Sequence, residues 1–274
     1  MLPPAFITWN ASPEIVHLGP LTLRWYGLLF AAGFLAGLYI VRRMFQAEKE
    51  PEEWLDKIFI YMVVGAVVGA RLGHVFFYDW GYYSKHLSEI PKVWEGGLAS
   101  HGGAIGVILA LWIFSRFTAN RSILWILDKV VVPTALAGSL IRLGNLMNSE
   151  ILGKPTHVAW AFIFTKVDEV PRHPVQIYES ISYLVSFVIL YRTYWHTDKR
   201  HKLGYIFGLF MVLIWGFRFF MEYFKDSQGG FESMFGNVLS TGQLLSIPFV
   251  AIGLYFMFRK APVLKTPTDS SIGE

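Results

Sequence analysis

The sequence predicts an all-α integral membrane protein with seven transmembrane helices. Of its 274 residues, 54% are hydrophobic and only 16% are charged, whereas a soluble domain averages about 25% charged residues. Apolar runs long enough to cross a bilayer recur along the chain, and basic residues gather in alternate loops between them. We therefore expect a single polytopic membrane domain over residues 1–274, with its two termini on opposite sides of the membrane.

Seven apolar runs are each close to the roughly 20 residues that a membrane-spanning helix needs. The predicted spans lie at about 20–41, 57–78, 97–115, 122–146, 174–195, 203–224 and 237–258. Three of them contain small residues four positions apart, which favour close approach of helix backbones. These pairs are Gly33 with Gly37, Gly65 with Gly69, and Gly102 with Gly106. The first 23 residues contain no Lys or Arg, so we do not expect a cleavable signal peptide with a basic start.

The loops differ in charge, and this difference predicts the orientation of the chain. One set of alternate loops carries thirteen basic residues and the other set carries six. Because cytoplasmic loops are enriched in Lys and Arg, the first set is predicted to be cytoplasmic. The N-terminus is then outside and the C-terminus is in the cytoplasm. Two outside loops, at about 79–96 and 147–173, are long enough to cover a site at the membrane surface.

Four arginines fall inside predicted spans, in the half nearer the outside: Arg24, Arg71, Arg142 and Arg218. A charged residue at membrane depth is expensive and marks a candidate functional site. The planar arginine fork binds phosphate or carboxylate through two parallel hydrogen bonds. This group therefore predicts an anionic ligand, and anchoring at a lipid headgroup is the alternative interpretation.

A histidine and two helical pairs lie at the same side. The stretch EGGLASHGG places His101 among glycines that leave its imidazole open to approach, and histidine is well suited to take a proton near neutral pH. An anchor or a hinge is the alternative for this residue. Arg142 and Asn145 share one helical face, and the spacing of Arg218 and Glu222 allows an ion pair.

Two features exclude other kinds of chemistry. The chain has no cysteine, so it has no disulfide and no thiol nucleophile of its own. No metal-binding motif appears among its eight histidines, so we expect neither a metal nor a cofactor. The sequence pI of about 9.1 is typical of nucleic-acid binders, but the basic residues lie scattered at the ends of apolar runs. Membrane orientation and anionic lipids explain that pattern without nucleic acid.

Several motifs together resemble bacterial prolipoprotein diacylglyceryl transferases. They are RWYG at Tyr26, GARLGHVFFY at Arg71, HGG at His101, RLGNLMNSEILGK from Arg142, HPVQIYE from His173, RFFMEYFKD from Arg218 and TGQLLS at Gln243. These matches run in order from about residue 22 to 246. Lys154 and Lys225 stand where the family has arginines, and Ile214 stands where a tyrosine is expected.

The resemblance implies a transfer reaction in the bacterial cytoplasmic (inner) membrane, with the site toward the periplasm. The diacylglyceryl group of phosphatidylglycerol moves to the lipobox cysteine of a prolipoprotein signal peptide, a thioether forms and glycerol phosphate leaves. The implied partners are phosphatidylglycerol, that signal peptide and membrane lipids. The nucleophile is a thiol, which this chain lacks and the substrate brings. Negative charge grows on the phosphate as its bond to carbon breaks, and a fixed arginine fork stabilises such charge.

The resemblance and the residue chemistry together assign candidate roles. Arg142 is expected to clamp the phosphate with the help of Asn145, and Arg218 to steady the leaving group with Glu222 fixing its guanidinium. His101 and Glu150 are the two alternatives for the base. Residues expected to bind substrate or to support the site are Tyr26, Arg71, Asn148, Gly153, Gln176 and Glu179.

A transporter or flippase of an anionic phospholipid is the alternative function. Such a protein also needs spans, arginines and glycines, but transporters usually contain internal repeats and midplane sites. No repeat is visible in this sequence, and its polar residues lie toward one side. A purely structural scaffold leaves the arginines inside apolar spans unexplained.

Overall fold

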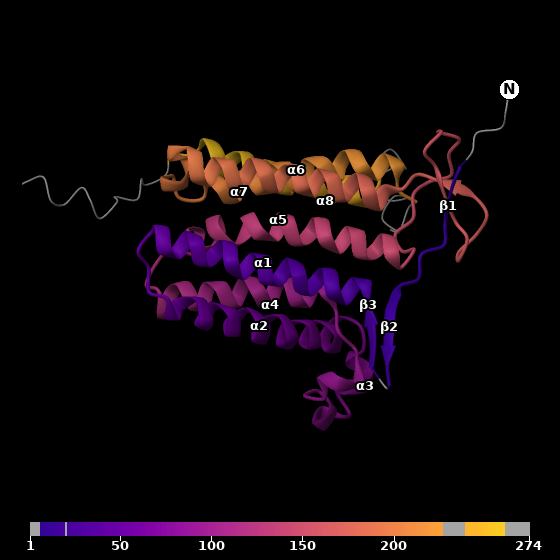
Figure 1. Cartoon of the computed structure of the whole chain (residues 1–274). Coiled ribbons are helices and arrows are strands. Elements are labelled where there is room, and N and C mark those ends of the chain that lie inside the picture. The colour runs from indigo at the N-terminus through magenta and orange to yellow at the C-terminus, as the bar shows by residue number, and fades with distance from the viewer. Residues whose placement is uncertain (1–5, 20, 227–238, 261–274) are drawn as a thin grey trace, which may run out of the picture. The chain divides into compact units, whose positions relative to one another are not determined.

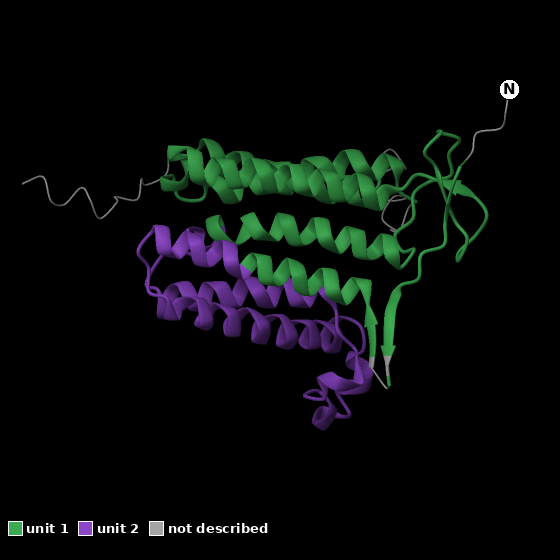
Figure 2. Ribbon diagram, in the orientation of Figure 1, with its two compact units in different colours: residues 1–37, 128–274 green, residues 38–127 purple. Residues whose placement is uncertain are grey.

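The computed structural model describes residues 6–19, 21–226 and 239–260. Most of these residues are helical (Figure 1). The long helices are α1 (Trp25–Ala47), α2 (Glu53–Phe77), α4 (Ser100–Ile113), α5 (Ile123–Met147), α6 (Val175–His196), α7 (Tyr205–Met221) and α8 (Thr241–Phe258). The chain forms two compact units: unit 1 contains residues 1–37 and 128–274, and unit 2 contains residues 38–127 (Figure 2).

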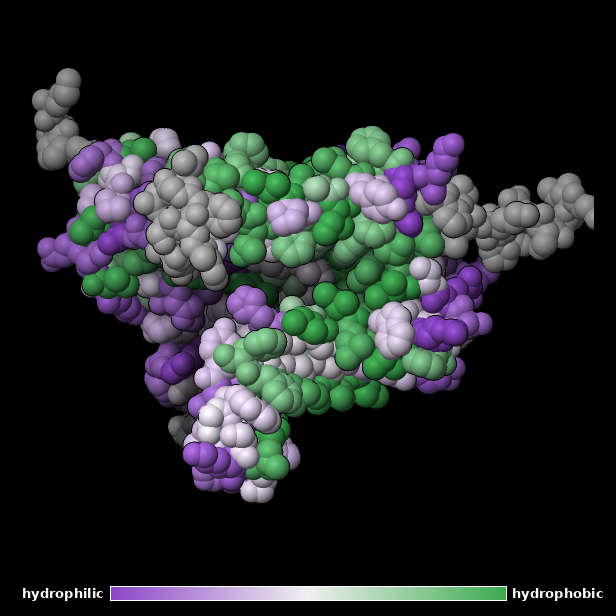
Figure 3. Space-filling view, turned by 180° about the vertical axis from the view of Figure 1, so that it is seen from behind, coloured by the Kyte–Doolittle hydropathy of each residue, from purple (hydrophilic) through white to green (hydrophobic). Residues whose placement is uncertain are grey.

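Six of the described helices are long and apolar enough to cross a membrane. They are α1, α2, α4 with its continuation to Thr118, α5, α7 with its continuation to Phe224, and α8. In the space-filling view, hydrophobic side chains gather along the helices and hydrophilic ones toward their ends (Figure 3). The remaining predicted span corresponds to α6, whose buried face carries polar side chains such as Gln176, Glu179 and Ser186. The count of seven spans therefore stays a prediction.

The predicted helical membrane fold is confirmed, but the protein is not all-α, because short strands accompany the helices. They are β1 (Ile7–Trp9), β2 (Glu14–Leu18), β3 (Leu21–Arg24), β4 (Phe162–Phe164) and β5 (Pro171–Arg172). The first helix begins at Trp25 and not near residue 20, since β3 pairs with β2 as an antiparallel hairpin. Gly19 in this hairpin has φ +62°, a conformation that glycine adopts without steric cost. The last helix begins at Thr241, and residues 237 and 238 of the predicted span lie outside the described residues.

Arg24 is also placed differently from the prediction. It lies in β3, is exposed, and forms an ion pair of 3.2 Å with Glu14. It is therefore not an arginine within a membrane-spanning helix. Its position follows from the hairpin, which pairs Glu14 with Arg24 across the two strands.

Unit 2 is built on the close packing of α2 against α4. A Cβ atom on Gly65 would lie 2.6 Å from the carbonyl oxygen of Gly106, and one on Gly69 would overlap the carbonyl oxygen of Gly102. These glycines therefore allow the two backbones to touch, as their spacing predicts. An apolar groove of about 620 Å³ runs along the same helix pair.

In unit 1, α6, α7 and α8 lie side by side (Figure 1). Ser139 of α5 and Ser180 of α6 share a hydrogen bond of 2.9 Å in the buried interface. β1 pairs with β4 in the parallel sense, and β4 pairs with β5 in the antiparallel sense. These pairings order the segment between α5 and α6. Trp9 donates a hydrogen bond of 3.0 Å from Nε1 to the carbonyl oxygen of Leu146. The N-terminal strand thus holds this segment at the ends of α5 and α6.

Candidate functional site

The centre of the candidate site is an ion pair between α5 and α6. Arg142 Nε lies 3.0 Å from Glu179 Oε2, and Arg142 Nη1 donates a hydrogen bond of 3.3 Å to Asn145 Oδ1. The guanidinium also lies over the ring of Tyr183, 5.8 Å from its centroid. Glu179 is only 2% exposed. Arg142 is therefore oriented by a buried carboxylate, an amide and an aromatic ring.

Glu179 is shared between two cations. Lys225, which follows the end of α7, donates a hydrogen bond of 3.3 Å from Nζ to Glu179 Oε1. Lys225 is 7% exposed and the Arg142 side chain 15%. Two positive groups thus face one negative group in a mostly buried environment. Because an uncompensated buried charge is costly, this cluster favours the approach of an additional anion.

Glu150 lies at the exposed edge of the same cluster. Its two carboxylate oxygens accept hydrogen bonds from Asn145 Nδ2 at 3.1 Å and Asn148 Nδ2 at 3.2 Å. Gln176 Nε2 donates a bond of 2.6 Å to the backbone carbonyl of Glu150. Asn145 therefore contacts both Arg142 and Glu150, so the phosphate-binding candidate and one candidate base belong to one hydrogen-bonded network.

The backbone around Glu150 is strained. Ser149 and Ile151 have φ values of +55° and +56°, a left-handed conformation that residues other than glycine adopt rarely and at a cost. The hydrogen bonds from Asn145, Asn148 and Gln176 offset that cost. The turn directs the Glu150 carboxylate toward the end of α5.

A second set of contacts holds Lys225 in place. Gly153 forms an antiparallel bridge with Lys225, and a Cβ atom on Gly153 would overlap the carbonyl oxygen of His173. Arg172 donates hydrogen bonds to Asp226 at 2.6 Å, to Asp168 at 2.7 Å and to the carbonyl oxygen of Gly153 at 3.1 Å. These contacts therefore join the segment that contains Gly153 and Arg172 to the segment that contains Lys225 and Asp226.

Tyr26, in the first turn of α1, packs against α5 beside the cluster. A Cβ atom on Gly144 would lie 2.8 Å from Tyr26 Cδ2, so the glycine makes room for the tyrosine ring next to α5. Six other predicted site residues meet in this network, namely Arg142, Asn145, Asn148, Glu150, Gln176 and Glu179.

Arg218 lies in α7, and Glu222 lies one helical turn later in its continuation. The described residues contain no ion pair between these two side chains. Arg218 Nε and Glu222 Oε2 are both buried without a hydrogen-bond partner among the described residues. Arg218 lies over the ring of Trp215 at 5.5 Å. The Glu222 carboxylate is directed at Gly242 of α8, where a Cβ atom would lie 2.5 Å from it. Helical spacing permits the predicted pair, but packing against α8 turns the carboxylate away.

The other predicted site residues, His101 and Arg71, belong to unit 2. His101 is exposed in the first turn of α4. Arg71 is 3% exposed and donates hydrogen bonds to the backbone carbonyls of Glu89, Ile90 and Gly96 at 2.7–2.8 Å. Its guanidinium lies 4.9 Å from the ring centroid of Tyr83. In this arrangement Arg71 holds the loop between α2 and α4.

The sequence alone does not predict Lys225 as a site residue, since it reads as a loop cation where the family has an arginine. Its pairing with Glu179 brings together residues 46 positions apart, and no helical spacing predicts such a contact. The nearest available signal was its place three residues after Glu222 at the end of an apolar run.

The fold and the site define a multi-pass helical membrane protein with a buried arginine–carboxylate–lysine cluster between α5, α6 and the segment after α7. Residues 13–259 match the family model of prolipoprotein diacylglyceryl transferase. Similar proteins bear the name phosphatidylglycerol–prolipoprotein diacylglyceryl transferase. The relative from Tolumonas auensis is 48% identical, over 92% of this chain and 97% of its own length. The relative from Chloroherpeton thalassium is also 48% identical, over 93% and 94%, and that from Porphyromonas gingivalis is 45% identical, over 93% and 95%. The chain therefore belongs to the prolipoprotein diacylglyceryl transferase family, and the resemblance seen in its motifs is confirmed.

Proposed function

We propose that this chain transfers the diacylglyceryl group of phosphatidylglycerol to the cysteine thiol of a prolipoprotein lipobox. Membership of the family and the shared name of its relatives support the transfer between these two substrates. The cysteine sulfur attacks the glyceryl carbon that carries the phosphate oxygen. A carbon–sulfur bond forms, the carbon–oxygen bond breaks, and its electron pair leaves with glycerol phosphate.

The buried Arg142–Glu179–Lys225 cluster is the observation that carries the catalytic assignment. Negative charge develops on the phosphate as the carbon–oxygen bond breaks, and fixed donors in a site that excludes water stabilise such charge strongly. Glu179 and Asn145 hold the Arg142 guanidinium in one orientation, so little reorganisation is needed when the charge forms. We assign Arg142 to the phosphate and Lys225 to the positioning of Glu179.

The thiol proton has two candidate acceptors, Glu150 and His101. A free thiol with a pKa of about 8.5 is mostly protonated near neutral pH, so a base nearby accelerates attack. Glu150 is exposed and is linked to Arg142 through Asn145, which supports it as the base. His101 is exposed at the start of α4 and stays the alternative. The thiol proton is transferred to the residue that acts as the base.

We further propose that the chain crosses the bacterial inner membrane seven times, with this site toward the periplasm. The distribution of Lys and Arg between alternate loops supports this orientation. α6 then supplies the seventh span, with the polar side chains of its buried face directed at neighbouring helices.

The direct test uses the purified chain in detergent with phosphatidylglycerol and a lipobox peptide. Mass spectrometry of the peptide should show a gain of one diacylglyceryl unit on cysteine. A peptide with serine in place of cysteine is the matched control and should stay unmodified. In proteoliposomes, transfer of phosphatidylglycerol across the bilayer with an unmodified cysteine peptide would instead support a phospholipid transporter and overturn the proposal.

A further inference from the structure

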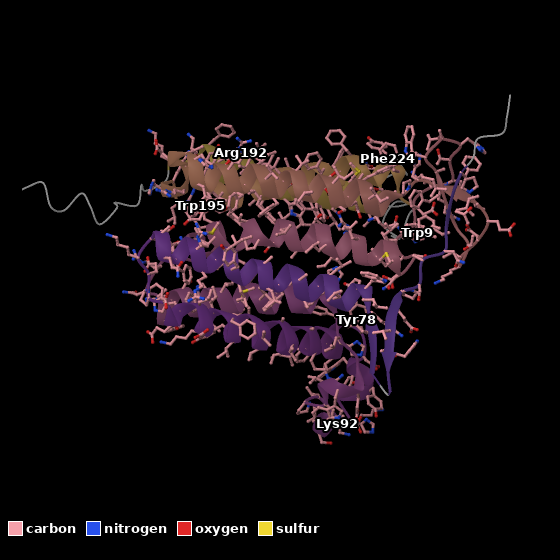
Figure 4. All side chains as sticks on the ribbon, viewed as in Figure 1. Trp9, Tyr78, Lys92, Arg192, Trp195 and Phe224 are labelled. Atoms are coloured by element: carbon pink, nitrogen blue, oxygen red, sulfur yellow. The ribbon has the colours of Figure 1, made fainter. Side chains whose placement is uncertain are left out.

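The end of unit 1 away from Arg142 contains an open basic pocket of about 670 Å³. It lies where α6 ends at His196, where the turn Asp198–His201 leads into α7, and where α8 ends at Phe258. Figure 4 labels Arg192 and Trp195 near this end of α6, and Phe224 near the other end of the helix bundle. The 22 residues of α6 span about 33 Å. The pocket is therefore separate from the candidate active site.

Four cations and one carboxylate line this pocket: Lys199, Lys202, Arg259, Lys260 and Asp198. Within residues 6–19, 21–226 and 239–260, none of the four cations forms an ion pair with a carboxylate. Asp198 is the one carboxylate among the lining residues, so the pocket keeps a net positive charge. An anion that enters the pocket gains attraction from several cations at once.

Two of the cations are fixed by backbone contacts. Lys202 Nζ donates a hydrogen bond of 2.6 Å to the carbonyl oxygen of Met257, and Arg259 Nη2 donates one of 2.9 Å to that of Leu203. Arg259 Nε is buried and has no hydrogen-bond partner among the described residues. These bonds join the α6–α7 connection to the end of α8, so the pocket is held by both segments.

The aromatic ring of Tyr205 lies close to both Lys199 and Lys202. The ammonium groups of Lys199 and Lys202 lie 5.4 Å and 5.6 Å from the ring centroid of Tyr205. The neighbouring surface of α8 is apolar, with Phe258 78% exposed and Tyr255 64% exposed. The pocket thus combines clustered cations with an adjoining apolar surface at the end of candidate membrane spans, an arrangement that suits a phosphate headgroup with acyl chains.

We propose that this pocket binds the phosphate group of an anionic phospholipid, at a site distinct from the site of diacylglyceryl transfer. The four cations meet the phosphate oxygens, and the acyl chains lie along the exposed apolar side chains of α8. Because the same pocket surface is formed by the α6–α7 turn and by α8, the bound lipid stabilises both segments in their observed arrangement. Phosphate chemistry alone also admits free inorganic phosphate, which the test separates from a lipid.

The test places the full-length chain in nanodiscs of phosphatidylcholine, with or without phosphatidylglycerol. Hydrogen exchange of the backbone amides of residues 197–203 and 257–260 reports on the pocket, and that of residues 142–150 reports separately on the candidate active site. A third arm adds inorganic phosphate to the phosphatidylcholine nanodiscs. We expect phosphatidylglycerol to slow exchange in the pocket segments, and inorganic phosphate to have a much smaller effect.

Two variants with the same change in net charge sharpen the test. Lys199→Gln with Lys260→Gln removes two pocket cations, whereas Arg116→Gln with Arg192→Gln removes two exposed arginines outside the pocket. Each lysine near an anionic lipid contributes about a fivefold gain in affinity. The first variant should therefore need about 25-fold more phosphatidylglycerol for half-maximal protection, and the second should resemble the unchanged chain. Diacylglyceryl transfer should be unchanged in both.

Each result then supports or overturns the proposal. Equal protection by inorganic phosphate would overturn the assignment to a phospholipid and indicate a site for free phosphate. Equal exchange with and without phosphatidylglycerol in the unchanged chain would overturn the proposal, even if the lysine variant failed to fold. Protection that survives in the lysine variant would overturn it as well. Loss of transfer activity with normal pocket protection would concern only the proposed enzymatic function.

Discussion

Lys225 Nζ and Arg142 Nε lie on opposite oxygens of the same carboxylate, at 3.3 Å from Glu179 Oε1 and 3.0 Å from Glu179 Oε2. Glu179 thereby fixes Arg142, the residue proposed to bind the phosphate, and is itself held in position by Lys225. The three residues come from α5, from α6 and from the segment after α7. Substitution of Lys225 should therefore alter the position of the Arg142 guanidinium through Glu179, without direct contact between the two side chains.

Replacement of Lys225 tests this coupling. Lys225→Met leaves Glu179 with Arg142 alone and removes a charged hydrogen bond from a buried site, which typically contributes about 1.5–3 kcal/mol. We expect a lower midpoint of thermal unfolding and at least about a tenfold loss of kcat. Lys225→Arg should retain most of the activity, because it keeps a cation at Glu179. Lys154→Met, at an exposed lysine, is the control and should be nearly neutral. Equal activity in the Met variants would remove Lys225 from the site.

Arg142→Lys tests the two-point contact with phosphate. The variant keeps a positive charge beside Glu179 but loses the planar fork. If the fork acts mainly on the transition state, kcat should fall by about a hundredfold while KM changes little. Steady-state kinetics with varied phosphatidylglycerol measures both constants. A variant with near-normal kcat would show that charge alone is enough.

The pH dependence of the rate separates the two candidate bases. General-base assistance typically contributes about a hundredfold or more. If Glu150 takes the proton, Glu150→Gln should lose this factor near neutral pH and recover partly as pH approaches the thiol pKa of about 8.5. His101→Asn should then have a profile close to that of the unchanged chain. Recovery at high pH in His101→Asn, with a normal profile in Glu150→Gln, would reverse the assignment.

The outer edge of the site should lose stability in acid. Hydrogen bonds from Arg172 hold the pKa of Asp168 below its usual value. The folded state therefore gains stability above the unfolded pKa of about 3.9, and loses it as pH falls through the lower folded value. Asp168→Asn should unfold at a lower temperature than the unchanged chain near neutral pH, and the difference should shrink below about pH 4.

The neighbouring Glu169 provides a control for this acid effect. It is exposed and adjacent to Asp168, and it forms no ion pair within the described part of the chain. Glu169→Gln should therefore follow the unchanged chain at every pH in the same thermal unfolding series. A difference between the Asp168 variant and the unchanged chain that persists unaltered at low pH would contradict the proposed role of the Arg172 contact.

Cysteine labelling tests the proposed topology, because the chain contains no cysteine of its own. His157→Cys and His196→Cys place thiols at exposed positions before the start and at the end of α6. In intact cells an impermeant thiol reagent should label the first and not the second. Ser149 is unsuitable for labelling since it is buried and has φ +55°. Labelling at residue 196 with protection at residue 157 would invert the orientation, and labelling of both would exclude a membrane crossing by α6.

The sequence by itself determined the class of protein and much of the candidate site. Apolar runs of span length require helices in a membrane, because backbone groups in lipid need hydrogen-bond partners within the segment. Residues three or four positions apart on a helix share a face, so the contact between Arg142 and Asn145 follows from spacing alone. The glycine pairs of α2 and α4 likewise predict close backbone packing, which the structure confirms.

Only the tertiary structure decided which distant residues meet. Leu21–Arg24 reads as the start of an apolar span, yet it forms a strand because Glu14–Leu18 offers it backbone partners. The spacing of Arg218 and Glu222 permits an ion pair, but the packing of α8 directs the carboxylate to Gly242. Lys225 meets Glu179 because the bridge with Gly153 and the contacts of Arg172 bring its segment back over α6. Local spacing specifies a helical face, whereas contacts between elements depend on the packing of the whole unit.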